Sequence, residues 1–546
     1  KMSNDADRIG RFFASRFKGK WRRDERALEQ YSTDMSMYRI LPRVVAFPRD
    51  EEDLQAVIDF AQEERIPLTP RCGGSSTSGS AIGSGILLVL TVSQRFGAMS
   101  DVEAPLAGGG AAVTAGVGVR HTRMQETLAV HGCFLPSDPT SGPLSYIGGN
   151  VAAKASGPHA LRHGSIDRYL QSVRFLTADG RLVDTSRPET IPAELARGVV
   201  QLGGRILADR PSADRLTSRL GMKTASGYNL FTFVRREAAE APEPRGTAAS
   251  GMRSAAGMLA AGHITQLMAG SVGTLGVLLD ATLVGIPRPE GRAVLLAAYR
   301  STEAACASIA PARELGAAAV ELMSSECIEI LRERFPDIQL PEPGTLLIMT
   351  EFIGPDRMDC IRRLQDELNG LGGADLAELR VADGEEEQER LWTARKRLMM
   401  IVRNFSDHHK ALSVVNDVGV PEERLAELIG SAESIFRGMG LVAPIFGHAG
   451  SGNLHLRPLF DIRSPDIKET VVRVADAVYD AVLRLGGTIT AEHGMGRLRT
   501  AYLEREWGPD IYGFMKEVKR LFDPEDILNP DCMFSGRSLA DDMFVG

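Results

Sequence analysis

The chain of 546 residues has few cysteines and no close cysteine pair. The six cysteines are widely scattered: Cys72, Cys133, Cys306, Cys327, Cys360 and Cys532. This spacing excludes a local zinc ribbon or a ferredoxin-type iron–sulfur motif within the chain. Scattered thiols in a chain of this size are typical of a reducing compartment such as the cytosol.

Long apolar runs are also absent. No stretch approaches the roughly 20 apolar residues that a transmembrane helix needs, and the first residues lack the apolar core of a signal peptide. We therefore expect a cytoplasmic protein. Any association with the inner face of a membrane would run through a partner.

Basic residues do not outnumber acidic ones. The chain has 63 Lys and Arg against 71 Asp and Glu, which gives a formal net charge of -8. Nucleic-acid binding needs clustered Lys and Arg, so this balance argues against nucleic acid as the main partner. The length exceeds what one ordinary hydrophobic core supports, so we expect two or more domains.

Strand and helix signals alternate in the first hundred residues. Apolar residues recur at helical spacing over Glu51–Glu64, and short apolar runs at 44–47, 66–70 and 85–90 predict strands on either side. This order is typical of an α/β or α+β nucleotide-binding layout.

The middle of the chain predicts a boundary between two domains. Residues 236–262 are rich in Ala, Gly, Pro and Glu, which predicts a loop or mobile insertion. Pro287-Arg288-Pro289 marks a boundary, after which a separate α+β region begins. Its expected strands are 293–299, 344–352 and 487–490, and its expected helices are 358–368 and 468–485.

Two glycine-rich segments are suited to binding phosphate through the backbone. In the first, Gly73–Gly79, exposed N–H groups would bind phosphate oxygens. It is neither a Walker A motif nor a G-x-G-x-x-G fingerprint, so alone it is better explained as a flexible loop. The second contains Gly148-Gly149-Asn150, where paired glycines allow close approach to a flat ring or pyrophosphate. Two such segments are less easily explained as turns.

Two short motifs near the C-terminus contain three of the ten histidines. His448 and His455 stand seven residues apart, and Glu492-His493 follows a predicted helix and strand. If His448 and His455 lie on a strand pair, their imidazoles can converge. Two His and one carboxylate are a common ligand set for zinc, with one position left open for substrate. Satisfied core histidines would explain any one of them, but the group favours a site. The polar His408-His409 predicts a surface pair.

The order of these motifs resembles the FAD domain of the vanillyl-alcohol-oxidase/PCMH superfamily. The first match is Pro70-Arg71-x-Gly73-Gly74-Ser75-Ser76. It is followed by Pro136-x-Asp138-Pro139, Ile147–Ala152, Ala155-Ser156-Gly157, Lys223 with Ser226–Leu230, and Gly270–Gly276. The resemblance implies that the first segment cradles the pyrophosphate and the second lines the isoalloxazine and adenine. The residues it implies for FAD binding are Cys72, Gly73, Gly74, Ser75, Ser76, Pro136, Asp138, Gly148, Gly149, Asn150, Ala152, Gly157 and, near the C-terminus, Asn529.

Some positions depart from this pattern. Cys72 stands where the family often has Gly, Lys154 where it often has Asn, and Val272 where it often has an acidic residue. The first loop lacks the His that holds FAD covalently in several relatives, so we expect noncovalent FAD. For Cys72, a packed thiol is expected rather than a tether.

The last part resembles the C-terminal domain of the glycolate oxidase, D-lactate dehydrogenase and D-2-hydroxyglutarate dehydrogenase group. The run Gly-His-x-Gly-x-Gly-Asn-x-His, the Glu-His-Gly motif and the tail Arg520–Pro530 carry the match, although Ser451 replaces the usual Asp. The resemblance implies a divalent metal, expected to be zinc, on His448, His455 and Glu492.

The same resemblance implies catalytic roles for four residues. His493 would be the general base. Arg395 of Trp392-x-x-Arg395 would clamp the substrate carboxylate, Lys410 would add a second cationic contact, and Asn453 would contact the substrate. A surface helix is the alternative for Arg395 and Lys410.

Together these matches, which extend from about Tyr31 to Pro530, imply an α+β protein of two main domains. We expect an N-terminal lead-in at 1–37 and a PCMH-type FAD-binding domain of two subdomains at 38–288. A substrate and metal domain of the FAD-linked oxidase C-terminal type would occupy 289–533, followed by a tail at 534–546.

The implied activity is FAD-dependent oxidation of a D-2-hydroxy acid, of the lactate, glycolate or 2-hydroxyglutarate class, to the 2-oxo acid. Hydride would pass to flavin N5 while a metal-assisted His takes the proton. Because the chain lacks iron–sulfur cysteines, a separate iron–sulfur or flavoprotein partner would accept the electrons; homo-oligomerisation stays open. Two alternatives are a degenerate FAD-binding electron-transfer subunit and a non-redox flavin enzyme of the alkylglycerone-phosphate synthase type. The His–His–Glu–His set argues against both.

Overall fold

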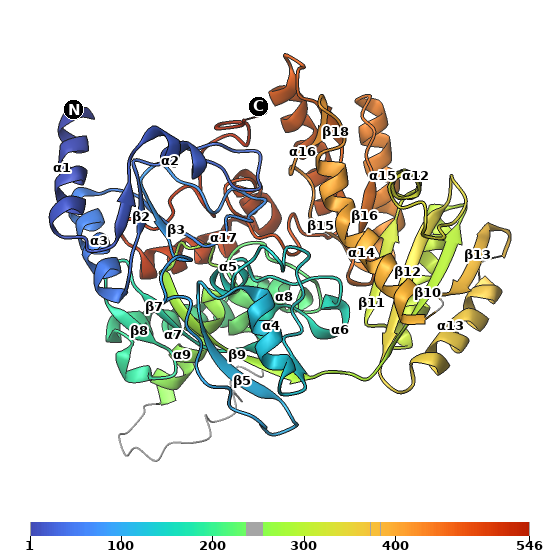
Figure 1. The fold of residues 1–546 in the computed structure, drawn as a ribbon, viewed down its shortest axis with the longest axis horizontal. Helices are drawn as coiled ribbons and strands as arrows, with labels where there is room; N and C mark the ends of the chain where they lie inside the picture. The colour runs from blue at the N-terminus through green and yellow to red at the C-terminus, as the bar shows by residue number, and fades with distance from the viewer. Residues whose placement is uncertain (1, 236–254, 372, 383, 545–546) are drawn as a thin grey trace.

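The computed structural model describes residues 2–235, 255–371, 373–382 and 384–544. Figure 1 shows an N-terminal lobe, coloured blue to green, beside a lobe of yellow and orange elements. The red helix α17 (Leu503–Phe522) lies in the N-terminal lobe although it belongs to the last part of the chain. None of the helices in the described ranges has both the length and the apolar character needed to cross a membrane.

A small sheet with a crossover helix begins the N-terminal lobe. Its order is β1 (Lys20–Arg22), β2 (Val44–Phe47), β4 (Ile86–Val89), β3 (Leu68–Arg71), and the last three strands are parallel. Helix α3 (Glu51–Glu64) connects β2 to β3, begins at the N-cap Asp50 and buries the predicted apolar stripe. Helix α1 (Met2–Ser15) packs on it through Phe12, which stacks on Phe60 at 4.1 Å.

A second, antiparallel sheet completes this lobe. Its order is β5 (Ala111–Gly116), β9 (Val277–Pro287), β7 (Leu170–Leu176), β8 (Leu182–Asp184), and β6 (Cys133–Phe134) pairs with β9. The helices of the lobe also include α2 (Glu25–Gln30), α4 (His121–Ala129), α5 (Ile147–Ala153), α6 (Ala160–His163), α7 (Ala193–Ala208), α8 (Arg210–Ser218) and α9 (Ala255–Met268). Two sheets with helices match the two expected subdomains.

The C-terminal lobe is built on a seven-stranded antiparallel sheet. Its order is β13 (Leu376–Val381), β10 (Arg292–Tyr299), β12 (Leu346–Ile353), β11 (Ala319–Met323), β16 (Ile445–His448), β17 (Asn453–Leu456) and β15 (Val418–Gly419). A separate pair joins β14 (His409–Ala411) to β18 (Leu459–Asp461).

Helices cover both faces of this sheet. Neighbouring residues of β10 belong to different cores, Val294 to one and Leu295 to the other, as strand alternation requires. One face is covered by α12 (Ser325–Arg334) and α14 (Gly384–Arg403). The other face is covered by α10 (Thr302–Ala307), α11 (Ile309–Glu314), α13 (Arg357–Leu371), α15 (Leu425–Gly438) and α16 (Ile467–Arg484).

Two sequence-based predictions of local structure are wrong. Residues 487–490 do not form a strand; only Thr488 forms an isolated bridge, with Gly419, because the chain turns at Gly486 and again before Glu492. Residues 255–262 are not a loop but the start of α9, since alanine is the best helix former. The rest of the expected loop, 236–254, lies outside the described residues.

The last residues of the chain pack on the N-terminal lobe. The Leu68 N–H donates to the Ile527 carbonyl (2.8 Å) and the Asn529 N–H donates to the Leu68 carbonyl (2.7 Å), so the tail lies along β3. Farther on, the Tyr38 hydroxyl donates to the Leu539 carbonyl (2.8 Å). The expected domain limits stay a prediction. Helix α17 and the tail that follows it pack on the N-terminal lobe, although the prediction placed residues up to 533 in the second domain.

Candidate active site

A cavity begins in the N-terminal lobe and ends against residues of the C-terminal part of the chain. The glycine loop after β3, helix α5 and the loop before β9 form most of its wall. Nine of the thirteen residues expected to bind flavin line it: Cys72, Gly73, Gly74, Ser75, Ser76, Gly148, Gly149, Asn150 and Ala152. At its far end it is lined by Arg395, Met399, Phe446, His455, Glu492 and His493.

The paired glycines begin helix α5 and allow very close packing. A Cβ on Gly148 would lie 2.5 Å from Val117 Cβ and 3.1 Å from Cys72 Sγ. The Cys72 thiol is itself packed, with Sγ 3.5 Å from the Val117 carbonyl, and burial raises its pKa to about 12. A thiol in this state is a poor nucleophile, which agrees with the expected noncovalent site.

The other four residues expected at the flavin do not line the cavity: Pro136, Asp138, Gly157 and Asn529. Asn529 is fully buried, and its amide donates to the carbonyls of Ser80 (2.9 Å) and Val272 (2.8 Å). It therefore joins two loops of the cavity wall. Gly157 packs directly against Asp138, where a Cβ has no room.

Val272 has a left-handed backbone at the cavity wall. Its φ of 46° is unusual for a β-branched residue, and such conformations cost on the order of 1–3 kcal/mol. Two hydrogen bonds hold it, from its N–H to the Ala152 carbonyl (2.9 Å) and from Asn529 to its carbonyl. The loop is thus fixed between α5 and the C-terminal tail.

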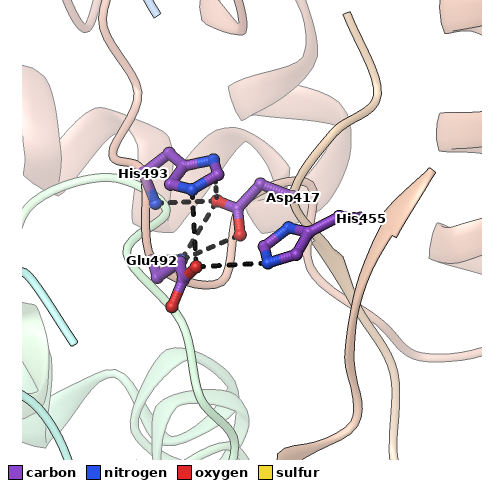
Figure 2. Close-up of side chains that lie close together, drawn as sticks. All are labelled: Asp417, His455, Glu492 and His493. Carbon is purple, nitrogen blue, oxygen red and sulfur yellow. Dashed lines mark hydrogen bonds and ion pairs between the residues drawn. The ribbon is translucent and has the colours of Figure 1, made fainter. Parts of the chain in front are cut away.

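Three imidazoles converge on one carboxylate at the far end of the cavity (Figure 2 shows two of them). The pairing of β16 with β17 places His448 and His455 on one face of the sheet, as the strand-pair hypothesis requires. The Nε2 atoms of His448, His455 and His493 lie 3.4, 3.5 and 3.4 Å from Glu492 Oε1. This geometry is suited to a shared cation.

The outer nitrogens of two histidines are engaged by other groups. His448 Nδ1 lies 2.7 Å from Glu321 Oε1, and His455 Nδ1 lies 2.7 Å from the Asn416 carbonyl. Such bonds fix the orientation of an imidazole and leave Nε2 for a metal. The sequence alone did not identify Glu321, although a lone carboxylate within the apolar strand β11 was a usable signal.

Asp417 is a second residue that the sequence analysis missed. It forms a potential metal-binding group with His455, Glu492 and His493, whose ligand atoms lie within 4.8 Å of one another. Its Oδ2 accepts the peptide N–H groups of Glu492 (3.0 Å) and His493 (2.8 Å), and its Oδ1 accepts from Asn453 (3.2 Å). Because its oxygens are occupied in this way, Asp417 is better suited to bracing the loop than to ligating.

The N-terminal lobe holds the other oxygen of Glu492. Lys223 Nζ lies 2.6 Å from Glu492 Oε2 and 3.1 Å from Asn453 Oδ1, and the Ser156 hydroxyl donates to Oε2 (3.3 Å). Oε1 is therefore directed to the histidines. The site is shared between the two lobes.

Charge and burial set the protonation states of this group. Burial alone would raise the pKa of Glu492, but Lys223 and His448 outweigh it and hold that pKa well below its ordinary value. Burial lowers the pKa of His455 to about 3. An ionised carboxylate beside a neutral imidazole is the state in which both groups bind metal.

The three expected substrate contacts have different surroundings. Arg395 lines the cavity and is buried, with Nη2 2.6 Å from Glu321 Oε2, so the surface-helix alternative does not apply to it. Lys410 lies on β14 opposite Phe460 and does not line the cavity. Asn453 is fully buried and donates to the Val418 carbonyl (3.0 Å). The structure brings Arg395 and His493 to the cavity, but not Lys410 or Asn453.

His159 joins the two lobes beside the site. Its Nδ1 lies 2.5 Å from Asp138 Oδ2 and its Nε2 lies 2.7 Å from Glu351 Oε1 on β12. The Trp392 indole donates to the other oxygen of Glu351 (2.6 Å). Burial would lower the pKa of His159, but Asp138 and Glu351 outweigh it and raise that pKa well above its ordinary value.

A glycine-lined cavity beside a histidine and carboxylate cluster is typical of a cofactor-dependent enzyme. Residues 42–186 match the family described as FAD binding domain, and residues 288–532 match the family described as FAD linked oxidases, C-terminal domain. The chain thus belongs to the FAD-linked oxidoreductases of the glycolate oxidase GlcD, D-lactate dehydrogenase and D-2-hydroxyglutarate dehydrogenase type. The predicted family and fold class are confirmed.

Known relatives are similar over most of the chain. Glycolate oxidase subunit GlcD of Bacillus subtilis (strain 168) is 26% identical, over 92% of this chain and 92% of that protein. D-2-hydroxyglutarate dehydrogenase of Escherichia coli (strain K12) is 26% identical over 91% of this chain and 49% of its own length, so this chain spans about half of it. The mitochondrial D-lactate dehydrogenase [cytochrome] of Arabidopsis thaliana is 26% identical over 90% and 73%.

Solved structures share the fold at low identity. The 4-ethylphenol oxidase from Gulosibacter chungangensis matches with a TM-score of 0.66 at 15% identity, over 98% of both chains. An alkyldihydroxyacetonephosphate synthase matches with a TM-score of 0.61 at 14% identity, over 96% of this chain and 85% of that one. At these identities the likeness concerns the fold alone.

Proposed function

We propose that the protein is a dehydrogenase that oxidises a D-2-hydroxy acid to the 2-oxo acid, with noncovalent FAD and a divalent metal. The observation that supports it most directly is the convergence of three Nε2 atoms on Glu492 Oε1 at the end of the cavity of an FAD binding domain. The hydroxy-acid relatives named above support the choice of substrate class.

The residues fit a metal ion by their chemistry. His448, His455 and Glu492 would hold it, and a set of two nitrogens and one oxygen is typical of zinc sites that keep a position open. Glu321 and the Asn416 carbonyl orient the two imidazoles, as partners of metal-binding histidines do. When bound, the metal would act as a Lewis acid that lowers the pKa of the substrate hydroxyl.

His493 is the proposed base. Its ring lines the cavity, its peptide N–H is fixed by Asp417 (2.8 Å), and its Nε2 lies 3.4 Å from Glu492 Oε1, beside the proposed metal ligands. A neutral imidazole there accepts the hydroxyl proton as hydride leaves C2. The hydride, which carries two electrons, would be accepted by FAD.

Arg395 would orient the substrate carboxylate. Its guanidinium borders the cavity, and its Nε has no hydrogen-bond partner within the described residues. The planar guanidinium group suits a carboxylate. Asn453 and Asn529 belong to the same proposal as supports of the pocket rather than as its lining, whereas Lys410 lies on β14 outside the cavity lining.

The electron acceptor is proposed to be a separate iron–sulfur or flavoprotein partner, and the location cytoplasmic. The six cysteines are free and scattered, which supports a cluster on another chain rather than on this one. This part of the proposal depends on the activity itself.

The test is anaerobic bleaching of the flavin by matched D- and L-2-hydroxy acids, before and after chelation and with zinc restored. We expect bleaching by a D-acid that chelation removes and zinc restores. The exposed His408→Ala variant is the control for the loss of a histidine outside the site. If no hydroxy acid bleaches the flavin of metal-loaded protein, the proposal is refuted.

A further inference from the structure

A buried histidine behind the cavity wall contacts one of the residues expected to bind FAD. His121 is the first residue of α4, and only 5% of its surface is exposed. Its Nδ1 lies 3.2 Å from the side-chain amide of Asn150, on α5. Asn150 lines the cavity, whereas His121 does not. His121 can therefore act on the contents of the cavity through Asn150.

The other ring nitrogen of His121 faces Gln125, about one turn farther along α4. His121 Nε2 lies 3.2 Å from Gln125 Nε2. The backbone of Leu135 fixes the Gln125 amide, because the amide nitrogen donates to the Leu135 carbonyl (2.7 Å) and the amide oxygen accepts from the Leu135 N–H (3.0 Å). Rotating this amide by 180° would break both bonds. Gln125 therefore donates its second N–H to His121 Nε2.

The imidazole of His121 can satisfy both neighbours in one way only. Burial lowers the pKa of His121 against the opposing effect of Asp138, so the ring is neutral near neutral pH. A neutral imidazole has one accepting and one donating nitrogen. Because Nε2 accepts from Gln125, Nδ1 carries the proton and donates to Asn150. The Asn150 amide, which rotates by 180° without a change of shape, must then present its oxygen to Nδ1.

This arrangement decides what Asn150 offers to the cavity. Its amide makes no other hydrogen bond within the described residues, and its second polar atom is open to the cavity. With the oxygen turned to His121, that second atom is the nitrogen, which is a hydrogen-bond donor. Asn150 is also the one polar side chain in the sequence of α5, so this part of the wall depends on it for side-chain hydrogen bonding.

We infer that His121 is a positioning residue for the cofactor: with Gln125, it holds the Asn150 amide so that the amide nitrogen donates to an acceptor atom of FAD. The acceptor is an oxygen or nitrogen of the flavin ring or a phosphate oxygen. This inference rests on the noncovalent FAD of the proposed function but not on its substrate. A donor that is oriented before binding strengthens binding, because less freedom is lost when the cofactor enters.

The test measures the dissociation constant of FAD by titrating it into flavin-free protein and following its fluorescence. His121→Leu should weaken FAD about 3- to 10-fold, which corresponds to about one hydrogen bond. His121→Asn should stay within about 2-fold of the unchanged protein, because its amide places a donor near the position of Nδ1. His121→Gln places the donor near Nε2 instead and should behave like His121→Leu. His131→Leu, at an exposed position after α4, is the control and should bind FAD normally.

A double-variant cycle separates positioning from a general structural role. Asn150→Leu removes the donor itself and should weaken FAD at least as much as His121→Leu does. Adding His121→Leu to Asn150→Leu should then change the dissociation constant less than about 2-fold, because His121 acts through Asn150. Losses that multiply in the double variant would overturn the inference, and so would normal FAD affinity in His121→Leu. If His121→Leu fails to fold, rescue by His121→Asn but not by His121→Gln supports the inference, and equal behaviour of those two variants overturns it.

The reduction potential of the bound flavin identifies the acceptor atom. If the amide donates to the flavin ring, His121→Leu and Asn150→Leu should both make the potential more negative, since a donor there stabilises the electron-rich reduced ring. Weakened binding at an unchanged potential assigns the acceptor to the phosphates. If the unchanged protein bound no FAD, both this inference and the proposed cofactor would be refuted. Tight FAD binding without bleaching by any hydroxy acid would refute the proposed oxidation alone.

Discussion

Replacing Glu321 by Gln should weaken metal binding and folding together. Glu321 is fully buried and contacts two basic side chains, His448 Nδ1 at 2.7 Å and Arg395 Nη2 at 2.6 Å. Those partners hold the pKa of Glu321 at about 2 against the opposing effect of burial, so the carboxylate is ionised. The amide keeps the shape of the side chain and removes its charge.

The two consequences have separate magnitudes. Leaving Arg395 buried without its counter-charge should cost about 3–5 kcal/mol of folding free energy. Loss of the carboxylate that orients His448 should weaken the metal about 10- to 100-fold. Denaturant unfolding of the metal-free protein measures the first effect, and competition with a chromogenic zinc chelator measures the second.

A double variant separates the two effects. Glu321→Gln with Arg395→Met removes the unpaired charge, so most of the lost stability should return while metal binding stays weak. Glu333→Gln, on the exposed surface of α12, is the matched control and should alter neither quantity. Unchanged zinc affinity in Glu321→Gln would refute the orienting role of Glu321.

Three further outcomes are expected. His493→Ala should slow flavin reduction by about 10²- to 10⁴-fold while flavin absorbance and zinc content stay normal, and normal reduction would rule out the base. Gly148→Val should be purified with little flavin because a side chain at this position overlaps its neighbours. The control Gly204→Ala, which lies in open space on α7, should retain flavin. Equal flavin content in the two variants would count against the proposed position of α5. His159 has a raised pKa, so the stability it contributes is present below its unfolded pKa of about 6.5 and lost as pH rises through the folded value. In denaturant unfolding, His159→Gln should therefore lose more folding free energy at pH 6 than at pH 9.5. A loss of the same size at both pH values would contradict this. The exposed His131→Gln is the control.

The sequence predicted best those elements that depend on residues close together in the chain, such as capped amphipathic helices. The bounds of α3 were predicted correctly because Asp50 caps a clear apolar stripe. Thr488 was expected in a strand because its apolar neighbours resemble one, but strand formation depends on a partner elsewhere in the chain. The glycine segment at 148 was expected to allow close approach to a flat ring or pyrophosphate, which stays a prediction. The structure shows it packed closely on Val117 and Cys72, in a helix that was not apparent from its composition.

The residues of the candidate site also fall into two groups, those in local sequence motifs and those brought together by the fold. The motifs around His448, His455 and Glu492 are local, so the sequence alone could identify them. Lys223 and Glu321 come from distant parts of the chain and approach the site only through the packing of the lobes.

The contact between the tail and β3 has a consequence for biosynthesis. The wall of the flavin cavity includes loops near residues 80 and 272, and both are tied to Asn529. During translation those loops are synthesised long before residue 529, so the N-terminal lobe of the nascent chain stays incompletely folded until the tail has been added. Cofactor capture should therefore follow synthesis of the tail, and nascent chains arrested before that point should be a target for chaperones rather than for FAD.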